Sequence, residues 1–438
     1  MNFQTTYRLV QQTPLIHFQH DQNGATLRAT EVKPKLDRFI IKKMGWTEKL
    51  KNEKERNEIR KEYKDWFIGE TDALNYKMRI VTNGAPEISR TIDIELEQDR
   101  NKKSALKEDA RNLISDIYYG NMVSGRGPER DEKVREQYKE TVFYPNKGQI
   151  ELIICCFNKA LRTTVDNFLA EFFIVTNFGT MQNKGFGSFI IDGSDIAPLT
   201  VAKYLKEANG SKVCYMFISN KPDERNRYQD RRFKDIKTLY GVMKSGLNHN
   251  DYHRSYLFEY CHEVLGIGNE KAAMKHEKIS PWKDGEPVRN PNNQKAFWDY
   301  GDQDYKYVRA MLGIGERIEY ITGFQWDENR RRYIPLKNKD TITYGNKTIE
   351  RLASPIRFKI IDDTVYIYAS RINSKIFSKE FVFTNGNGKS ILLSTPEAFD
   401  IDDFLKWFVN EYNKSAQKRS YDGRIVSYSI GKQIREVR

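Results

Sequence analysis

The sequence predicts an α+β protein in which the order strand, helix, strand, strand, helix, strand occurs twice. Runs rich in β-branched and aromatic residues, typical of strands, recur along the chain, and apolar stripes at helical spacing lie between them. A glycine-rich loop at 178–187 joins the second helix of the first cycle to its last strand. This order is that of the ferredoxin-like (RRM-like) βαββαβ unit. We expect two such domains in tandem, at residues 1–196 and 197–438, with a large helical and irregular insertion in the second at about 248–340.

The first strand and helix are indicated by residues 3–18 and by the segment that starts near Pro34. Residues 3–18 alternate in polarity, and Pro14 within them indicates an edge strand or a bulge. The fixed φ of proline suits a first helical turn, so the helix is expected to begin near Pro34. The dense mixture of Lys, Glu and Arg at 47–66 predicts a solvated helix beyond the core.

The rest of the first cycle contains a hairpin, a polar stretch and a second strand–helix–strand run. Residues 76–81 and 90–96 predict the hairpin, and a helical stretch is expected at about 105–117. A buried strand at 150–157 precedes a helix, and the chain returns to strand at 188–192. The apolar stripe of this helix comprises Leu161, Val165, Phe168, Leu169 and Phe172.

The second cycle begins with a strand at 212–219 and a basic helix at 231–243. The pattern is then interrupted by the insertion, in which 307–320 resembles a helix. The later elements are a hairpin around Asp362 and Asp363, an amphipathic helix at 400–414 whose first turn holds Asp402 and Asp403, and a final strand at 427–434. A turn and a helix N-terminus account for both acidic pairs, so neither is expected to be catalytic.

The composition excludes several classes of protein and favours a polyanion as partner. The 438 residues carry 73 Lys and Arg against 60 Asp and Glu, a net charge of +13. Aromatic residues make up 13%, enough to build cores, so the chain is not mostly disordered. The apolar runs are too short to span a bilayer, and the N-terminus does not read as a secretory signal. Positive charge together with aromatic faces suits single-stranded nucleic acid.

The cysteines and histidines predict neither a disulfide framework nor a metal centre. Cys155 and Cys156 are adjacent in an apolar run, Cys214 and Cys261 stand alone, and no C-x-x-C pair occurs. We expect reduced thiols in a cytoplasmic protein that has no metal and no cofactor.

The glycine-rich loop is the first candidate site. Glycine lets the backbone turn with positive φ and approach a ligand closely, so its amides can face phosphates. Lys184 would add charge, and Phe186 a face for stacking or packing. The loop is neither a Walker loop nor a dinucleotide fingerprint, because it follows a helix and precedes a strand. We expect it to lie outside the core, although a turn that merely closes the fold is the alternative. The candidate RNA-binding residues are Asn183, Lys184, Gly185, Phe186 and Gly187.

The start of the first helix is the second candidate site. Free amides and the helix dipole favour an anion at a helix N-terminus, and nearby cations would strengthen the attraction. A charged helix start can equally be just solvated. The candidates are Arg28, Thr30, Lys33, Lys35 and Arg38.

Three short stretches resemble motifs of the RAMP superfamily of CRISPR–Cas effector proteins. They are TPLIHF at 13–18, LRATEVKPKLDRF at 27–39 and NKGFGSF at 183–189. Together with the tandem arrangement and RLASPIRFKI at 351–360, they look most like the first RAMP subunit of the type III-B (Cmr) complex. The chain departs from the family pattern in EVKPKLDRF and in having one basic residue, Lys184, in its glycine-rich loop.

The resemblance implies an RNA-binding subunit of a type III-B CRISPR effector ribonucleoprotein. Such a subunit would lie near the 3′ end of the guide RNA and help to bind target RNA in antiviral defence. Its expected partners are guide CRISPR RNA, target RNA and the other subunits of the complex, with no membrane. Base pairing between guide and target would supply the sequence choice. A scaffold with an unrelated basic surface is a further, weaker interpretation.

The remaining alternative is an enzyme. His249 and His253 are four residues apart, so on a helix they would share a face and could act as acid and base. Some RAMP relatives cleave RNA without metal, which makes a metal-independent endoribonuclease using His249 or His253 the alternative function. The zinc-protease Glu is missing beside the first His, and structural roles are the other interpretation. His17 and His20 could touch RNA or face water, and Arg254 is a further candidate RNA contact.

Overall fold

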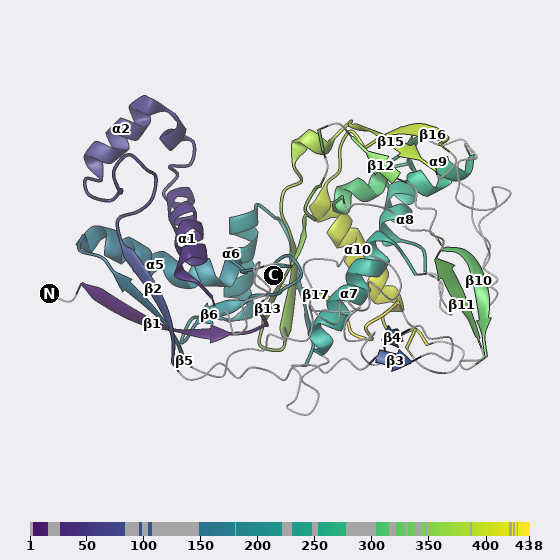
Figure 1. Cartoon of the computed structure of the whole chain (residues 1–438), viewed down its shortest axis with the longest axis horizontal. Coiled ribbons are helices and arrows are strands. Elements are labelled where there is room, and N and C mark those ends of the chain that lie inside the picture. The colour runs from purple at the N-terminus through teal and green to yellow at the C-terminus, as the bar shows by residue number, and fades with distance from the viewer. Residues whose placement is uncertain are drawn as a thin grey trace. The chain divides into compact units, whose positions relative to one another are not determined.

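The protein is a mixed α+β molecule that divides into two units (Figure 1). Unit 1 comprises Met1–Ala208, Ser219–Phe233 and Phe358–Tyr366, and unit 2 comprises Asn209–Ile218, Lys234–Arg357 and Ile367–Arg438. The computed structural model describes residues 3–15, 27–83, 96–98, 104–106, 149–179, 181–220, 230–247, 253–276, 304–314, 321–328, 332–337, 343–346, 348–349, 351–385, 388–419, 423, 425–426 and 428–438.

Unit 1 is built on a four-stranded antiparallel sheet with the strand order β2-β5-β1-β6. The chain order around this sheet is β1, α1, β2, β5, α5, β6, which is the predicted order of strands and helices. The bounds are β1 Gln4–Gln11, α1 Ala29–Lys43, β2 Lys77–Asn83, β5 Gln149–Cys155, α5 Lys159–Val175 and β6 Phe189–Ile191.

The core of unit 1 lies between one face of this sheet and the helices α1 and α5, which cover the same side of it (Figure 1). Strand β5 alternates, because Ile150, Leu152 and Ile154 are buried while the residues between them are only half-buried. The stripe predicted for α5 packs on these side chains, with Phe168 partly buried and the other four members fully buried.

The first helix begins earlier than predicted. It starts at Ala29, so Pro34 lies inside α1 rather than in its first turn. The interruption is local because Pro34 is exposed and removes one hydrogen bond from the helix. The first strand is also shorter than the predicted 3–18: β1 ends at Gln11, and Pro14 lies beyond it.

The charged segment 47–66 holds the expected solvated helix, but it is wrong that the segment lies beyond the core, because Leu50, Ile59 and Trp66 belong to the apolar cluster. It forms η1 (Lys49–Lys51) and α2 (Glu53–Glu62), and part of it is buried. Trp46 packs against Tyr63, Trp66 and Phe67, with ring centroids 4.6–6.0 Å apart. The buried indoles belong to the same apolar cluster as the sheet.

The predicted hairpin and helix that follow are partly wrong. The partner of β2 is β5, and residues 90–95 lie outside the described part of the chain. Leu96 belongs to β3 (Leu96–Gln98), which pairs with β4 (Ser104–Leu106). Ala105 and Leu106 are therefore in a strand rather than in a helix, and the rest of the helix expected at about 105–117 lies outside the described residues.

A second sheet has the order β13-β14-β7-β17, with chain order β7, α7, β13, β14, α10, β17. The final strand is Arg435–Glu436 instead of the predicted 427–434. Helix α6 (Pro198–Asn209) was not predicted, although Val201, Ala202 and Leu205, at helical spacing, are buried. The other bounds are β7 Cys214–Ile218, α7 Arg231–Lys244, β13 Ile356–Ile361, β14 Thr364–Ala369 and α10 Ile401–Ser415.

The region between α7 and β13 is less irregular than predicted. The helix expected at 307–320 is limited, within the described residues, to the 3-10 helix η3 (Val308–Leu312). The other elements are α8 Tyr256–Glu263, β8 Gly268–Asn269, α9 Glu270–His276, β9 Tyr305–Lys306, β10 Ile321–Asp327, β11 Arg332–Lys337 and β12 Thr343–Gly345. Between β14 and α10 the chain forms η4 Ser374–Ile376, β15 Glu380–Thr384 and β16 Ser390–Ser394, and β12, β15 and β16 make a sheet.

The four cysteines are free thiols, of which Cys155 is half-buried and the others are buried. In the described part of the chain, no helix has the length and apolar character needed to cross a membrane. The acidic pairs have the structural surroundings expected of them. Asp362 lies in the β13–β14 turn with positive φ, and the Asp400 side chain caps α10 by accepting from the amides of Asp402 and Asp403.

Candidate nucleic-acid interface

The glycine-rich loop is fastened to unit 1 by backbone hydrogen bonds. The amide of Phe178 donates to the Gly187 carbonyl at 2.9 Å, and the amide of Gly187 donates to the Pro14 carbonyl at 2.8 Å. Gly187 has φ +64°, and a Cβ there would lie 2.0 Å from the Phe178 carbonyl oxygen. Glycine is therefore required at this position by both backbone conformation and space.

The loop amides are directed into the protein. The amide of Gly179 donates to the Glu31 carboxylate at 2.8 Å, that of Gly185 to the Gln182 carbonyl at 3.2 Å, and that of Gly187 to Pro14. The prediction that these glycine amides face phosphates is therefore wrong for this conformation. A phosphate would have to displace internal hydrogen bonds to reach them.

The two side chains expected to touch RNA from the loop also point inward. Phe186 is 1% exposed, and its ring stacks on Phe233 with centroids 4.0 Å apart. The ammonium group of Lys184 is buried and lies over the Phe358 ring, 5.7 Å from its centroid. Phe186 thus packs rather than offering a face to a base, and the expectation that the loop lies outside the core is wrong. Asn183 is half-buried, and its carbonyl accepts from the Phe358 amide at 3.0 Å.

A chain of buried hydroxyls connects the loop to the end of β1. Thr13 donates from Oγ1 to the Gly185 carbonyl at 2.8 Å and accepts from the Ser188 amide at 2.9 Å. Ser188 in turn donates from Oγ to the Ile360 carbonyl at 2.7 Å. Thr13 and Ser188 are both fully buried, so these bonds satisfy groups that water does not reach.

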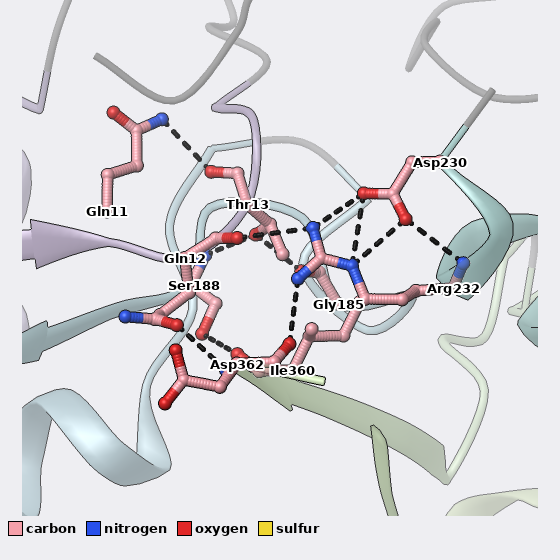
Figure 2. Close-up of polar contacts among 9 residues, drawn as sticks. All are labelled: Gln11, Gln12, Thr13, Gly185, Ser188, Asp230, Arg232, Ile360 and Asp362. Atoms are coloured by element: carbon pink, nitrogen blue, oxygen red, sulfur yellow. Dashed lines mark hydrogen bonds and ion pairs between the residues drawn. The ribbon is translucent and has the colours of Figure 1, made fainter. Parts of the chain in front are cut away.

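Beside this chain lies a buried ion pair that was not predicted from the sequence (Figure 2). Arg232 and Asp230 are each 2% exposed, and the shortest contact between guanidinium and carboxylate is 2.6 Å. Arg232 also donates to the carbonyls of Asp362 at 2.9 Å and Gln12 at 3.4 Å, and the Gln12 side chain accepts from the Asp362 amide at 2.8 Å. Arg232 therefore holds together the end of β1 and the β13–β14 turn. One signal in the sequence could have indicated this pair. Asp230 precedes the helix by one residue and accepts from the Arg232 amide as a helix cap does, and this places its carboxylate next to the Arg232 side chain.

Lys359 is a further buried basic residue near the loop. Its ammonium group donates to the carbonyls of Phe173 at 2.8 Å and Thr176 at 3.0 Å, at the C-terminus of α5, where the helix dipole favours positive charge. Burial lowers the pKa of Lys359 well below its usual value. The position of Lys359 among the apolar residues of β13 is the sequence signal that could have indicated its burial.

Helix α1 is joined to the loop through one acidic side chain. Glu31 accepts from the Gly179 amide and from the Lys35 ammonium at 3.0 Å, and Lys35 also donates to the Asn177 carbonyl at 3.3 Å. The structure therefore brings the two predicted sites, the loop and the start of α1, together. Lys33 has a different role, because it pairs with the buried Asp37 at 2.7 Å and donates to the Leu74 carbonyl at 2.8 Å.

The outward side of α1 carries a row of cations. Residues 35, 38 and 42 are three and four apart and thus share one helix face. Arg38 and Lys42 are exposed and Lys35 is half-buried. We call Lys35, Arg38 and Lys42 the basic face of α1. Near the start of the helix, Arg28 is half-buried and Thr30 is exposed, and the Arg28 side chain does not cap the helix.

Of the remaining candidates, His253 and Arg254 belong to unit 2 and are described separately. His253 packs between Tyr256 and Tyr428, with ring centroids 4.3 and 4.5 Å away, and its Nδ1 contacts the Arg254 carbonyl. Arg254 is half-buried and acts electrostatically on Glu259, whose pKa is raised by burial to about 7. His249, His17 and His20 lie outside the described residues.

Among the described residues, no group of three or more His, Cys, Asp or Glu side chains could hold a metal ion. The polar side chains around the loop are cations, amides and hydroxyls together with two carboxylates, Glu31 and Asp230, each of which is paired with a cation. The exposed cations of this region are Arg38 and Lys42 on α1.

The strand orders, antiparallel sheets and helices define a two-domain α+β protein. A model of the Cmr1 N-terminal domain matches residues 2–247, and a model of the Cmr1 C-terminal domain matches residues 252–436. The chain belongs to the Cmr1 family, and the resemblance to the first RAMP subunit of the Cmr complex is thereby confirmed. The two models leave residues 248–251, which include His249, between them. The boundary predicted at residue 196 stays a prediction.

Two solved structures are similar to the chain at low identity. One is the crystal structure of Cmr1 from Pyrococcus furiosus in its apo form, with 8% identity over 90% of this chain and 99% of that chain and a TM-score of 0.34. The other is the cryo-EM structure of the type III-B Cmr-beta complex bound to cognate target RNA, with 12% identity over 92% of this chain and 98% of that chain and a TM-score of 0.38. No curated protein matches the sequence.

Proposed function

We propose that this protein is an RNA-binding subunit of a type III-B CRISPR effector ribonucleoprotein. In that complex it would lie near the 3′ end of the guide RNA and help to hold target RNA for antiviral defence. One observation carries the proposal, in a chain of the Cmr1 family. Glu31 connects the basic face of α1 to the RAMP-type glycine-rich loop, because it accepts from both Lys35 and the Gly179 amide. Guide RNA, target RNA and the other subunits are the proposed partners, in the cytoplasm.

In this proposal the side chains, rather than the loop amides, contact the RNA backbone. Arg38 and Lys42 are exposed along the helix, and Arg28 and Thr30 lie at its start. Arg and Lys contacts to phosphate position a nucleic acid without reading its sequence, which is left to base pairing between guide and target. Asn183, half-buried in the loop, stays a proposed RNA contact. The loop would serve as a rigid support, because its glycines and Phe186 are occupied within unit 1. Arg254, in unit 2, stays a separate proposed RNA contact.

The expected result of neutralising the basic face is a weaker salt dependence of RNA binding. Each phosphate contact contributes about −0.7 to the slope of log K against log salt for a single strand, so Arg38→Gln with Lys42→Gln should make the slope less negative by about 1.4. The measurement is a binding titration of a labelled single-stranded RNA at several salt concentrations.

The matched control is Lys54→Gln with Lys61→Gln, which removes the same charge from exposed positions on α2. The control slope should equal that of the wild type. Equal slopes in the α1 variant and the wild type would remove this face from the interface.

The alternative function, an endoribonuclease that uses His249 or His253, makes a different prediction. General acid–base assistance contributes about 10²–10⁴-fold, so loss of a catalytic His would lower the cleavage rate by that factor. We expect instead that His249→Ala and His253→Ala leave the rate of target cleavage by the assembled complex within about twofold of the wild-type rate. Such a change is far smaller than the loss expected when an acid–base group is removed. The supporting observation is that His253 is packed between two tyrosine rings.

The variant His253→Phe separates packing from proton transfer, because it keeps a flat ring and has no titratable nitrogen. Cleavage by the His253→Phe complex should match that of the wild type. A drop of 100-fold or more in complexes that still assemble and bind target would favour the endoribonuclease.

A further inference from the structure

A cleft in unit 2 lies at one end of the β12-β15-β16 sheet, where β12 ends and β15 begins. Its volume is about 600 Å³, within the range of about 300–1,000 Å³ that is usual for small-ligand sites. One wall follows β12, and the other comes from η4 and the turn that leads into β15. The lining residues are Thr348, Ile349, Ser374, Lys375, Phe377 and Lys379.

The wall that follows β12 is held by the Asn346 side chain. Asn346 accepts from the amides of Thr348 at 2.8 Å and Ile349 at 3.0 Å. It also donates to the Glu380 carbonyl at 2.7 Å, at the start of β15. This one side chain therefore ties the first wall of the cleft to the strand that follows the second.

The second wall is held by Thr395, which is fully buried. Its hydroxyl donates to the Ile376 carbonyl and accepts from the Lys379 amide, the latter at 2.9 Å. Between them Ser378 has φ +53°, a left-handed conformation that is uncommon for a residue other than glycine. Such a conformation persists where the surrounding bonds determine it, and it is often found at ligand-binding segments. The cleft is thus preformed, which lowers the cost of ordering it around a ligand.

The side chains of the cleft combine positive charge with an apolar surface. Lys375 and Lys379 are exposed, and the lining residues that the structure describes include no carboxylate. Phe377 and Ile349 are half-buried and supply the apolar part. Ser374 adds a hydroxyl, which can donate to an anion. A ligand that fits this cleft carries a negative charge next to an apolar group.

We propose that this cleft binds one nucleotide of single-stranded RNA, with the base against Phe377 and the phosphate held by Lys375 and Lys379. Aromatic side chains beside positive charge bind single strands by stacking, with little sequence preference. A protein segment fits less well, because lysine is depleted in the core of protein–protein interfaces, whereas Lys and hydroxyl side chains commonly contact phosphate. The inference deepens the proposed function and rests on it, since it gives unit 2 a contact with the same class of ligand.

The charge contribution is tested by Lys375→Gln with Lys379→Gln, in a titration of a labelled uridylate oligomer at several salt concentrations. Both lysines are exposed, so the fold should be unaffected. Loss of one phosphate contact should make the slope of log K against log salt less negative by about 0.7. The control of equal charge is Lys54→Gln with Lys61→Gln on α2, which should leave the slope unchanged.

The stacking contribution is tested by comparing Phe377→Leu, Phe377→Tyr and the wild-type protein at one salt concentration. Loss of one stacked base corresponds to about 5- to 150-fold weaker binding, which is the effect expected of Phe377→Leu. Phe377→Tyr keeps the ring and should bind as the wild type does. Photocrosslinking of the wild-type protein to an oligomer containing 5-iodouridine needs no mutation, and we expect a crosslink at Phe377.

The outcomes separate this inference from the function on which it rests. If the wild-type protein does not bind the oligomer, both fall. If the variant of the basic face of α1 shows its expected change in slope, while the Lys375 and Lys379 variant keeps the wild-type slope and no crosslink forms at Phe377, the proposed function stands and this inference is overturned. That result would leave the cleft to an acidic segment of a protein subunit. A crosslink at Phe377 from 5-iodouridine monophosphate and none from the oligomer would also overturn it, since the cleft would then take a free nucleotide.

Discussion

Replacing Arg232 with Met is expected to lower the free energy of unfolding by about 3–5 kcal/mol, because removal of one partner leaves a buried carboxylate uncompensated. Asp230 and Arg232 are each 2% exposed, and the guanidinium also satisfies two carbonyls from distant segments. The measurement is chemical denaturation of the wild type and the variant under the same conditions.

The control for this prediction is Lys234→Met, which removes one positive charge from an exposed position on the same helix. It should change the stability by less than about 0.5 kcal/mol, as is usual for surface substitutions. Changing the whole pair, with Arg232→Met and Asp230→Leu, should cost less than Arg232→Met alone, since no charge is then buried without a partner. A loss below about 1 kcal/mol for Arg232→Met, far short of that for a broken buried pair, would contradict this account.

Gly187→Ala is expected to destabilise the protein by about 2–5 kcal/mol, as the sum of a left-handed backbone cost of about 1–2 kcal/mol and an overpacking cost of about 1–3 kcal/mol. The Cβ would lie 2.0 Å from the Phe178 carbonyl oxygen, so the two ends of the loop, at Phe178 and Gly187, would have to move apart. Thermal and chemical unfolding of the purified variant measure the loss.

Gly193→Ala isolates the steric part of this effect. Gly193 has a similar φ of +78°, but a Cβ at that position would meet nothing within 4 Å. It should therefore show the backbone cost of about 1–2 kcal/mol alone. Equal losses at Gly187 and Gly193 would show that the close approach to Phe178 contributes nothing.

These two predictions concern the support of the proposed interface rather than its surface. Arg232 holds the end of β1 and the β13–β14 turn, and Thr13, at the end of β1, holds the carbonyl of Gly185. Gly187 holds the loop on Pro14. A rigid loop keeps Gly179 in place for Glu31, and thus fixes the basic face of α1 relative to the loop. Buried polar contacts of this kind orient a binding surface without touching its ligand.

Hydrophobic periodicity correctly predicted the helices and strands that bury one apolar face. The stripe of α5 and the helix at 400–414 were identified because apolar residues recur at helical spacing, and both helices bury those residues. The strand at 150–157 and the hairpin around Asp362 and Asp363 follow from the same kind of signal. The burial of the charged segment 47–66 was missed because its many charged residues outweigh Trp66, which is buried against Trp46, just before the segment.

The sequence by itself determined the order of strands and helices around the first sheet. It also determined the family and located the two candidate sites, the glycine-rich loop and the start of α1. All of these depend on local patterns. The tertiary structure alone decided what each polar group of those motifs does. Arg232 bonds to Gln12, 220 residues away, and Asn177 bonds to Phe358, 181 residues away, and no local pattern contains such partners. Whether a lysine is buried, as Lys359 is, or exposed, as Lys42 is, depends on which remote segment packs against it. The exposed cations that we propose as the RNA-binding surface could therefore be chosen only from the folded chain.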